Sequence, residues 1–211
     1  MNAVFKTGLV AILLALSATA SADWSANIGW QSDYYFRGIF QKESSAQGGL
    51  DFESSGFYAG VWAADVGGGV TGDGLEVDGY FGYNGEVGDF NYGVGYTGYF
   101  YTGDFDDTYQ EINLSAGVSF LTLAAAIGEY KNFDGPTVNY QFYSLTAEHN
   151  GFWGQIGTFA DEFEGTYVQV GYDTTIAEID MGLSFLYSDE NLVGEDEQAL
   201  IFSIGKTFDL P

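Results

Sequence analysis

A two-residue alternation of apolar and polar side chains runs through most of the chain after residue 22. In residues 24–36 the even positions are mostly apolar, from Trp24 to Phe36, and the odd positions are mostly polar. Successive side chains of a β-strand point to opposite faces, so this segment is expected to form a strand with one apolar face. No apolar run beyond residue 22 approaches the ~18 residues of a transmembrane helix. The pattern therefore predicts an all-β chain.

Twelve segments show this alternation or a weaker strand-like pattern, and single-chain bacterial outer-membrane barrels have an even number of strands. Connections after odd-numbered segments are long and polar, such as residues 67–74 and 189–197, whereas most others are tight turns. That asymmetry is typical of outer-membrane barrels with both termini in the periplasm. The candidate strands are residues 24–36, 45–53, 57–65, 75–84, 90–97, 111–118, 121–130, 139–148, 152–160, 167–172, 179–185 and 198–208.

The alternative fold is a soluble antiparallel sandwich, which also alternates. A sandwich core would be rich in Leu, Ile and Val. Here the apolar face is rich in Tyr, Phe and Trp near strand ends, and the opposite face is rich in Gly, Ser, Asn and Thr. The chain also ends with Leu200, Phe202 and Ile204 in phase with Phe208, which resembles the C-terminal signal read by the barrel-insertion machinery. We therefore predict an antiparallel transmembrane β-barrel of about 12 strands in the bacterial outer membrane, surrounded by lipid and lipopolysaccharide.

The first 22 residues are predicted to be a cleaved signal peptide. Lys6 supplies a positive charge, residues 8–16 form a short apolar run, and Ala20-Ser21-Ala22 satisfies the small-x-small rule for cleavage. Residues 23–211 are then expected to form one barrel domain.

Acidic residues dominate the predicted mature chain. It holds four basic residues against 30 acidic ones, a formal charge of −26. Nucleic acid is excluded as a partner because binding to its phosphate backbone needs a basic face. The absence of cysteine means that the fold has no disulfides to stabilise it.

Three short motifs resemble a known family. They are residues 32–38 (SDYYFRG), 47–49 (QGG) and 56–62 (GFYAGVW), and residues 75–78 and 82–83 match a further block. This pattern resembles the proteobacterial TorF porin family, also known as the Gcw_chp domain. One departure is Ser45-Ala46, where the family usually has a proline before the QGG motif. The resemblance implies an outer-membrane barrel that acts as a porin, without a defined substrate.

Several ionisable residues fall on the predicted inward face of the barrel. An excess of carboxylates around a continuous water path would favour cations, so we predict passive diffusion of small polar solutes with a cation preference. In the alternative, Arg37 pairs with the acids and fills a narrow lumen, and the closed barrel has a structural or binding role through its acidic extracellular loops. The predicted pore-lining residues are Arg37, Asp51, Glu53, Glu76, Asp78, Tyr80, Glu111, Asp173 and Asp180.

Catalytic chemistry finds no support in the sequence. The only histidine, His149, falls in a predicted periplasmic turn, and the chain has no cysteine nucleophile and no phosphate-binding loop. The acidic loops 104–107, 161–164 and 195–197 lack the spacing of an EF-hand. We therefore predict no enzyme activity, no cofactor and no metal site.

Overall fold

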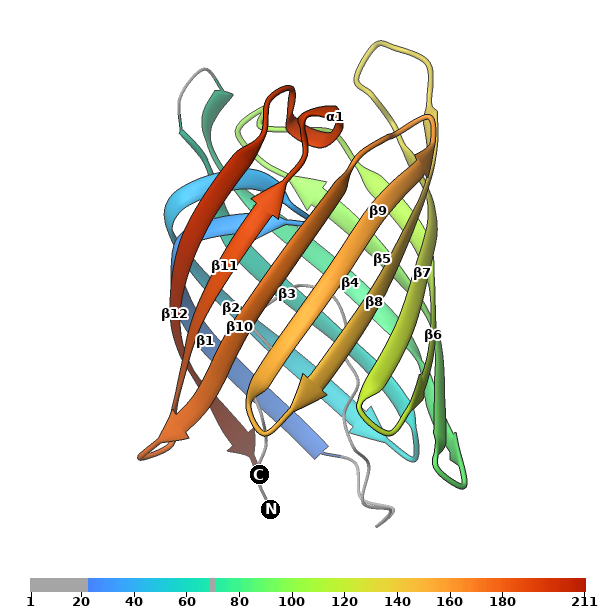
Figure 1. Cartoon of the computed structure of the whole chain (residues 1–211), viewed down its shortest axis with the longest axis vertical. Coiled ribbons are helices and arrows are strands. Elements are labelled where there is room, and N and C mark those ends of the chain that lie inside the picture. The colour runs from blue at the N-terminus through green and yellow to red at the C-terminus, as the bar shows by residue number, and fades with distance from the viewer. Residues whose placement is uncertain (1–22, 69–70) are drawn as a thin grey trace.

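The computed structural model describes residues 23–211 except 69–70, so the predicted signal peptide lies outside the described residues. Twelve antiparallel strands pair in chain order, and β1 pairs with β12 to close the barrel (Figure 1). The predicted fold class is confirmed. The strands are β1 (Asp23–Phe36), β2 (Ile39–Ser54), β3 (Phe57–Gly68), β4 (Thr71–Val87), β5 (Phe90–Tyr101), β6 (Tyr109–Val118), β7 (Leu121–Tyr130), β8 (Val138–His149), β9 (Phe152–Asp161), β10 (Thr166–Ile176), β11 (Ile179–Ser188) and β12 (Glu197–Leu210), and one short helix, α1 (Glu190–Val193), precedes β12.

Two-residue turns join the strands at the lower end of Figure 1, where the C-terminus lies. In the turn Ser55-Gly56 both residues have positive φ, 51° and 86°. This left-handed pair matches the twist of the flanking strands and makes the tightest hairpin connection. The turn at Ser119-Phe120 has no Gly, Asn or Pro, and Ser119 itself takes the left-handed conformation with φ 56°. The prediction of tight turns after even-numbered strands is confirmed.

The upper end carries longer connections, with two exceptions that correct the prediction. β2 begins at Ile39, so the first connection is only Arg37-Gly38, and residues 67–74 belong almost entirely to β3 and β4. Arg37 and Gly38 have φ values of 49° and 83°, which form the same tight turn as at the lower end. His149 is the last residue of β8, and the turn that follows is Asn150-Gly151.

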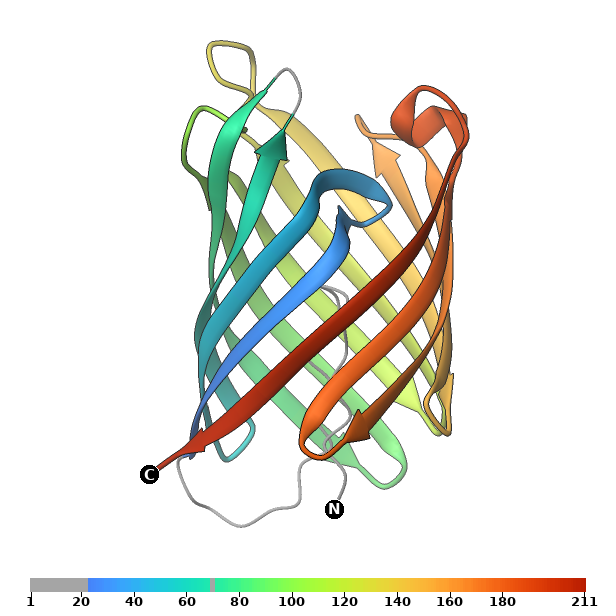
Figure 2. The same ribbon diagram turned by 90° about the vertical axis from the view of Figure 1, so that its left-hand side faces the viewer.

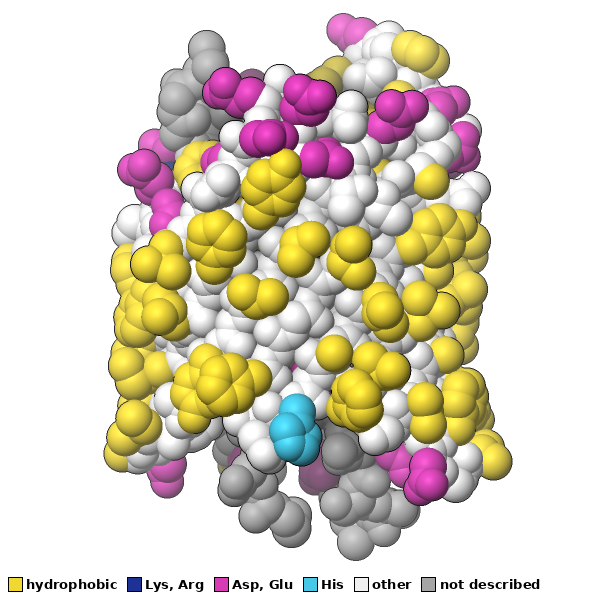
Figure 3. All heavy atoms as spheres, in the orientation of Figure 1, with side chains coloured by type: hydrophobic (Ala, Val, Ile, Leu, Met, Phe, Trp, Pro, Cys, Tyr) yellow, Lys and Arg dark blue, Asp and Glu magenta, His cyan; other side chains and the backbone are white. Residues whose placement is uncertain are grey.

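A belt of apolar side chains covers the outside of the barrel (Figure 3). It includes Phe81, Ile112 and Leu183, each more than half exposed. Acidic side chains gather above this belt at the upper end, and the single histidine lies at its lower edge (Figure 3). Soluble monomers rarely expose so large an apolar area, whereas lipid-facing barrels expose such a band between two polar ends.

Among the described residues, no helix has the length and apolar character needed to cross a membrane.

The end of the first hairpin, residues 32–46, leaves the wall, and we call it the inner hairpin. β1 pairs with β12 only as far as Gln31 opposite Ser203, and β2 pairs with β3 only from Gln47 opposite Ala64. Beyond those pairs the hairpin bends toward the interior, as Figure 1 shows in blue, and in Figure 2 it stands apart from the strands on both sides. Within the hairpin the β1–β2 register shifts between Tyr34 and Tyr35, where Gln41 is an extra residue of β2, and Ser44 has a φ of 56°. A bulge of this kind bends a hairpin and re-aims its side chains.

This bend overturns the predicted orientation of two aromatic residues. Tyr34 and Phe36 continue the apolar even phase of β1, yet Tyr34 is only 2% exposed and packs against Trp62, 5.9 Å away between ring centroids. Phe36 packs against Tyr99 at 5.4 Å. The two-residue alternation of β1 continues through both residues, but the inner hairpin has left the wall, so both rings meet the interior instead of lipid.

A charge introduced on the belt tests whether it faces lipid. Ile156 lies at the middle of β9, and its replacement by Arg should cost about 2–4 kcal/mol in a bilayer. The matched change Ile176→Arg, at the lower end of β10, should cost about 1 kcal/mol or less because it lies near the interface. Tryptophan fluorescence against guanidinium concentration, for the barrel in phosphatidylcholine vesicles, measures both. Two equally small losses would mean that the belt meets water.

Candidate functional site: the barrel interior

The interior divides into a packed upper zone and a polar lower zone, which we call the upper lumen and the lower lumen. The inner hairpin fills the upper lumen against side chains of β3 to β11. Nearly inaccessible aromatic and aliphatic residues surround it. They include Tyr99, Tyr140, Phe142, Tyr167 and Leu186, each at most 3% exposed.

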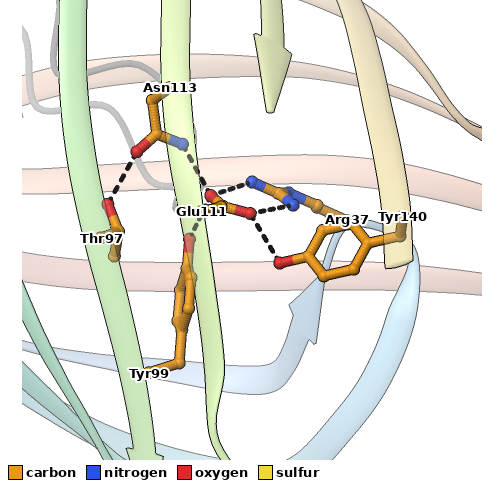
Figure 4. A network of polar contacts seen from close by, with 6 residues as sticks. All are labelled: Arg37, Thr97, Tyr99, Glu111, Asn113 and Tyr140. Atoms are coloured by element: carbon orange, nitrogen blue, oxygen red, sulfur yellow. Dashed lines mark hydrogen bonds and ion pairs between the residues drawn. The ribbon is translucent and has the colours of Figure 1, made fainter. Parts of the chain in front are cut away.

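An ion pair between the hairpin tip and the opposite wall organises the upper lumen (Figure 4). Two guanidinium nitrogens of Arg37 donate to the two oxygens of Glu111 on β6, at 2.9 and 2.7 Å. Glu111 also accepts hydrogen bonds from Tyr99 at 2.7 Å, Tyr140 at 2.9 Å and Asn113 at 2.6 Å. A bidentate, charge-assisted pair of this kind fixes both the distance and the orientation of its two partners.

The tight turn at Arg37-Gly38 places the tip against the far wall. A Cβ atom on Gly38 would lie 2.7 Å from Cβ of Tyr167, so only glycine fits there without displacement. The Gly38 carbonyl accepts a hydrogen bond of 2.6 Å from Ser188 on β11. The Arg37 guanidinium lies 4.3 Å from the ring centre of Phe142, in the geometry of a cation–π contact. The tip is therefore docked on three elements of the wall.

Charges in the upper lumen do not balance. Glu76 and Asp78 on β4 are 0% and 1% exposed and share the cluster with Glu111, whereas Arg37 is its single cation. Tyr34 donates to Glu76 at 3.1 Å, but one carboxylate oxygen of Glu76, one of Asp78 and Nε of Arg37 lack a partner among the described residues. Burying such polar atoms without a hydrogen-bond partner is unfavourable, and contact with water would remove this cost.

The other basic residues do not compensate these acids. Lys42 pairs with Asp73, Lys131 with Glu129 and Lys206 with Glu178. Each of these pairs includes a partner that is substantially exposed.

The remaining predicted residues lie in the lower lumen, where side chains keep part of their exposure. Asp51 accepts from Asn27 at 3.1 Å and from the Tyr80 hydroxyl. Asp180 accepts from Thr175 at 2.6 Å, near the lower rim. Glu53 and Asp173 point inward by strand phase and are half-buried. The structure thus gathers Arg37, Glu76, Asp78 and Glu111 in the upper lumen and leaves Asp51, Glu53, Tyr80, Asp173 and Asp180 below them.

Sequence reasoning missed several residues that hold this cluster. Tyr34 was assigned to the outward face, and Tyr140 lies in a strand whose alternation is mixed. Tyr99 and Tyr167 also point into the upper lumen, at 3% and 2% exposure. The only signal for these tyrosines in the sequence was that they lie close to predicted inward carboxylates.

Metal ligation finds no site in the described part of the chain. No group of three or more His, Cys, Asp or Glu residues there lies close enough to hold a metal ion. In the loop 104–107, Asp106 instead accepts hydrogen bonds from Tyr109 at 2.9 Å and Tyr130 at 2.8 Å.

A double-mutant cycle on the central ion pair tests its role in docking the hairpin. Arg37→Met leaves the buried Glu111 without its cation, so it should reduce the free energy of local opening of residues 32–38 by about 3–5 kcal/mol. Adding Glu111→Gln should return about 1–3 kcal/mol of that loss. Hydrogen exchange read by mass spectrometry measures the opening. The exposed pair Lys206→Met and Glu178→Gln is the control and should show no coupling; equal coupling in both pairs would contradict a special role for Arg37.

Comparison with known proteins agrees with the barrel. A family model described as a bacterial protein of unknown function (Gcw_chp) matches residues 15–184. No curated protein matches the chain.

Solved structures show the likeness of fold. A structure described as "Unveiling the Mechanism Behind the in-meso Crystallization of Membrane Proteins" aligns over 89% of this chain and 84% of its own, with a TM-score of 0.55 and 9% identity. OpdK of Pseudomonas aeruginosa, described with vanillate, aligns over 80% of this chain and 57% of its own, with a TM-score of 0.43 and 12% identity. A mutant porin of Rh. blastica aligns over 91% of this chain and 100% of its own, with a TM-score of 0.36 and 9% identity. Only the first exceeds a TM-score of 0.5, and at these identities the likeness concerns the fold alone.

Proposed function

The chain belongs to the Gcw_chp family of bacterial proteins of unknown function, and we propose that it is an outer-membrane porin of the TorF type. Its substrates would be small polar solutes that diffuse passively, with a preference for cations. The porin-like closed barrel and its apolar belt support this placement in the membrane.

The observation that carries the proposal is the lower lumen. Four inward carboxylates, Asp51, Glu53, Asp173 and Asp180, remain partly exposed there. Charged groups inside a barrel are stable when water reaches them, so a polar and partly exposed face favours a hydrated interior. Carboxylates around a water path raise the local concentration of cations and lower that of anions.

Outer-membrane placement brings further expected partners. The apolar belt would contact lipid and the lipid part of lipopolysaccharide, and the barrel-insertion machinery would assemble residues 23–211 after removal of the signal peptide. Catalysis has no place in this proposal, because the one histidine lies at the lower end, away from external substrates.

A second candidate function follows from the packed upper lumen. If the inner hairpin stays docked, the barrel is closed and would act through its surface instead. The acidic side chains at the upper end support such a binding or structural role (Figure 3). Conduction separates the two functions.

The deciding experiment is single-channel recording of refolded residues 23–211 in a planar bilayer, with the reversal potential taken in a KCl gradient. Folding is checked first by heat-shifted gel mobility. We expect discrete conductance steps with a cation-selective reversal potential. A folded barrel that conducts neither as the natural sequence nor as the Arg37→Met variant, in which docking of the inner hairpin is weakened, would overturn the porin proposal and favour the closed barrel.

Neutralising the lower lumen should weaken its preference for cations. Asp51→Asn with Glu53→Gln removes two inward charges and should move the reversal potential toward zero. Asp134→Asn removes one charge from an exposed loop and should leave the reversal potential unchanged, since charges beyond a Debye length of about 10 Å at 0.1 M salt are screened. Equal shifts in both variants would show that the lower lumen does not set selectivity.

A further inference from the structure

Because the inner hairpin leaves the wall, one edge of β12 and one edge of β3 have no neighbouring strand beside them. β12 begins at Glu197, but its pairing with β1 ends at Ser203 opposite Gln31. β3 extends to Gly68, but its pairing with β2 ends at Ala64 opposite Gln47. The wall is therefore incomplete above these pairs, between residues 197–202 of β12 and 65–68 of β3.

A straight hairpin would fill this opening if both existing strand registers simply continued. In the β1–β12 register, positions 32–37 would face 202–197, so β12 begins where the hairpin tip would meet it. In the β2–β3 register, positions 46–43 would face 65–68, so β3 ends inside the span of β2. Unpaired strand edges are unfavourable in a membrane barrel, because each free backbone group costs free energy in lipid.

Side-chain bonds replace part of the missing backbone pairing at this opening. The amide of Phe202 donates to the hydroxyl of Ser32 at 3.0 Å, and the carbonyl of Asp65 accepts from the hydroxyl of Ser45 at 2.7 Å. These bonds occupy the positions where backbone partners would stand if the hairpin were straight.

The sequence of the inner hairpin alternates as a wall strand should. In a straight β1, Tyr34 and Phe36 would continue the outward phase of Ile28 and Trp30, and Phe40 would face outward from β2. Asp33, Tyr35 and Arg37 would then face the lumen. A straight hairpin would also expose the upper cluster to water, which would satisfy the unpartnered oxygens of Glu76 and Asp78.

We propose that the inner hairpin is a gate with two positions, docked in the lumen as observed, or straightened into the wall between β3 and β12. This inference rests on the proposed channel function for its purpose, but its structural claim can be tested separately. Docking is stabilised by the Arg37–Glu111 pair, and straightening by backbone pairing with both edges. Ser44, with its φ of 56°, is the hinge.

The chain has no cysteine, so an engineered pair reports the straight position directly. Phe36→Cys with Gln198→Cys places two thiols opposite each other only if the β1–β12 register continues to the tip. Ala26→Cys with Phe208→Cys is the matched control, because these two residues already stand opposite each other. Positions 26 and 36 lie an even number of residues apart in β1, so both cysteine pairs occupy the same kind of site in the antiparallel ladder. After oxidation in vesicles, we expect a disulfide in both pairs, formed more slowly in the first.

Hinge variants make the test specific to the bend. A branched side chain disfavours positive φ, so Ser44→Val should speed cross-linking of the 36–198 pair about tenfold. Ser44→Gly accepts that conformation and should not speed it. Neither change should alter the control pair. If the 36–198 variant does not fold by heat-shifted gel mobility, Tyr34→Cys with Leu200→Cys tests the same register.

Recording conductance of the same samples separates this inference from the channel function. A disulfide that forms and raises conductance over the reduced sample supports both. A disulfide without conduction supports the movable hairpin and overturns the channel. Conduction with no disulfide in either hairpin pair, while the control pair cross-links fully, overturns the gate and leaves the channel standing.

Discussion

Every backbone N–H and C=O group within a bilayer must find a partner inside the protein, and this requirement governs the whole molecule. Twelve strands with neighbours in chain order meet it by closing β1 onto β12. Closure removes all sheet edges along most of the wall, so the outer face can be entirely apolar. A departure lies at the inner hairpin, where two edges remain unpaired and local side chains supply substitutes.

That departure explains the unusual interior. A barrel of 12 strands encloses more space than its own side chains fill, and the hairpin occupies the upper part of it. The tip must then satisfy a buried guanidinium, and Glu111 with its three further donors does so. The cost appears at β4, where Glu76 and Asp78 are buried without a cation of their own. The upper lumen is therefore stabilised at the Arg37–Glu111 pair and destabilised at Glu76 and Asp78.

Much of this structure could be predicted from the sequence, because a two-residue period reports strand faces directly. The strand count, the lower turns and the inward phase of Glu76, Asp78 and Glu111 all follow from alternation. The hairpin bend could not be predicted in that way. The bend involves a register shift between Tyr34 and Tyr35 and a positive φ at Ser44, and serine is not distinctive for positive φ. The composition of the cluster depended in turn on that bend, since Tyr34 and Arg37 reach it only through the inner hairpin.

The disagreement between pattern and structure is itself informative. Tyr34 and Phe36 keep the phase of a lipid-facing strand, whereas Arg37 and Gly38 fit a docked tip closely. The presence of both is what a hairpin that occupies the wall and the lumen in turn would require.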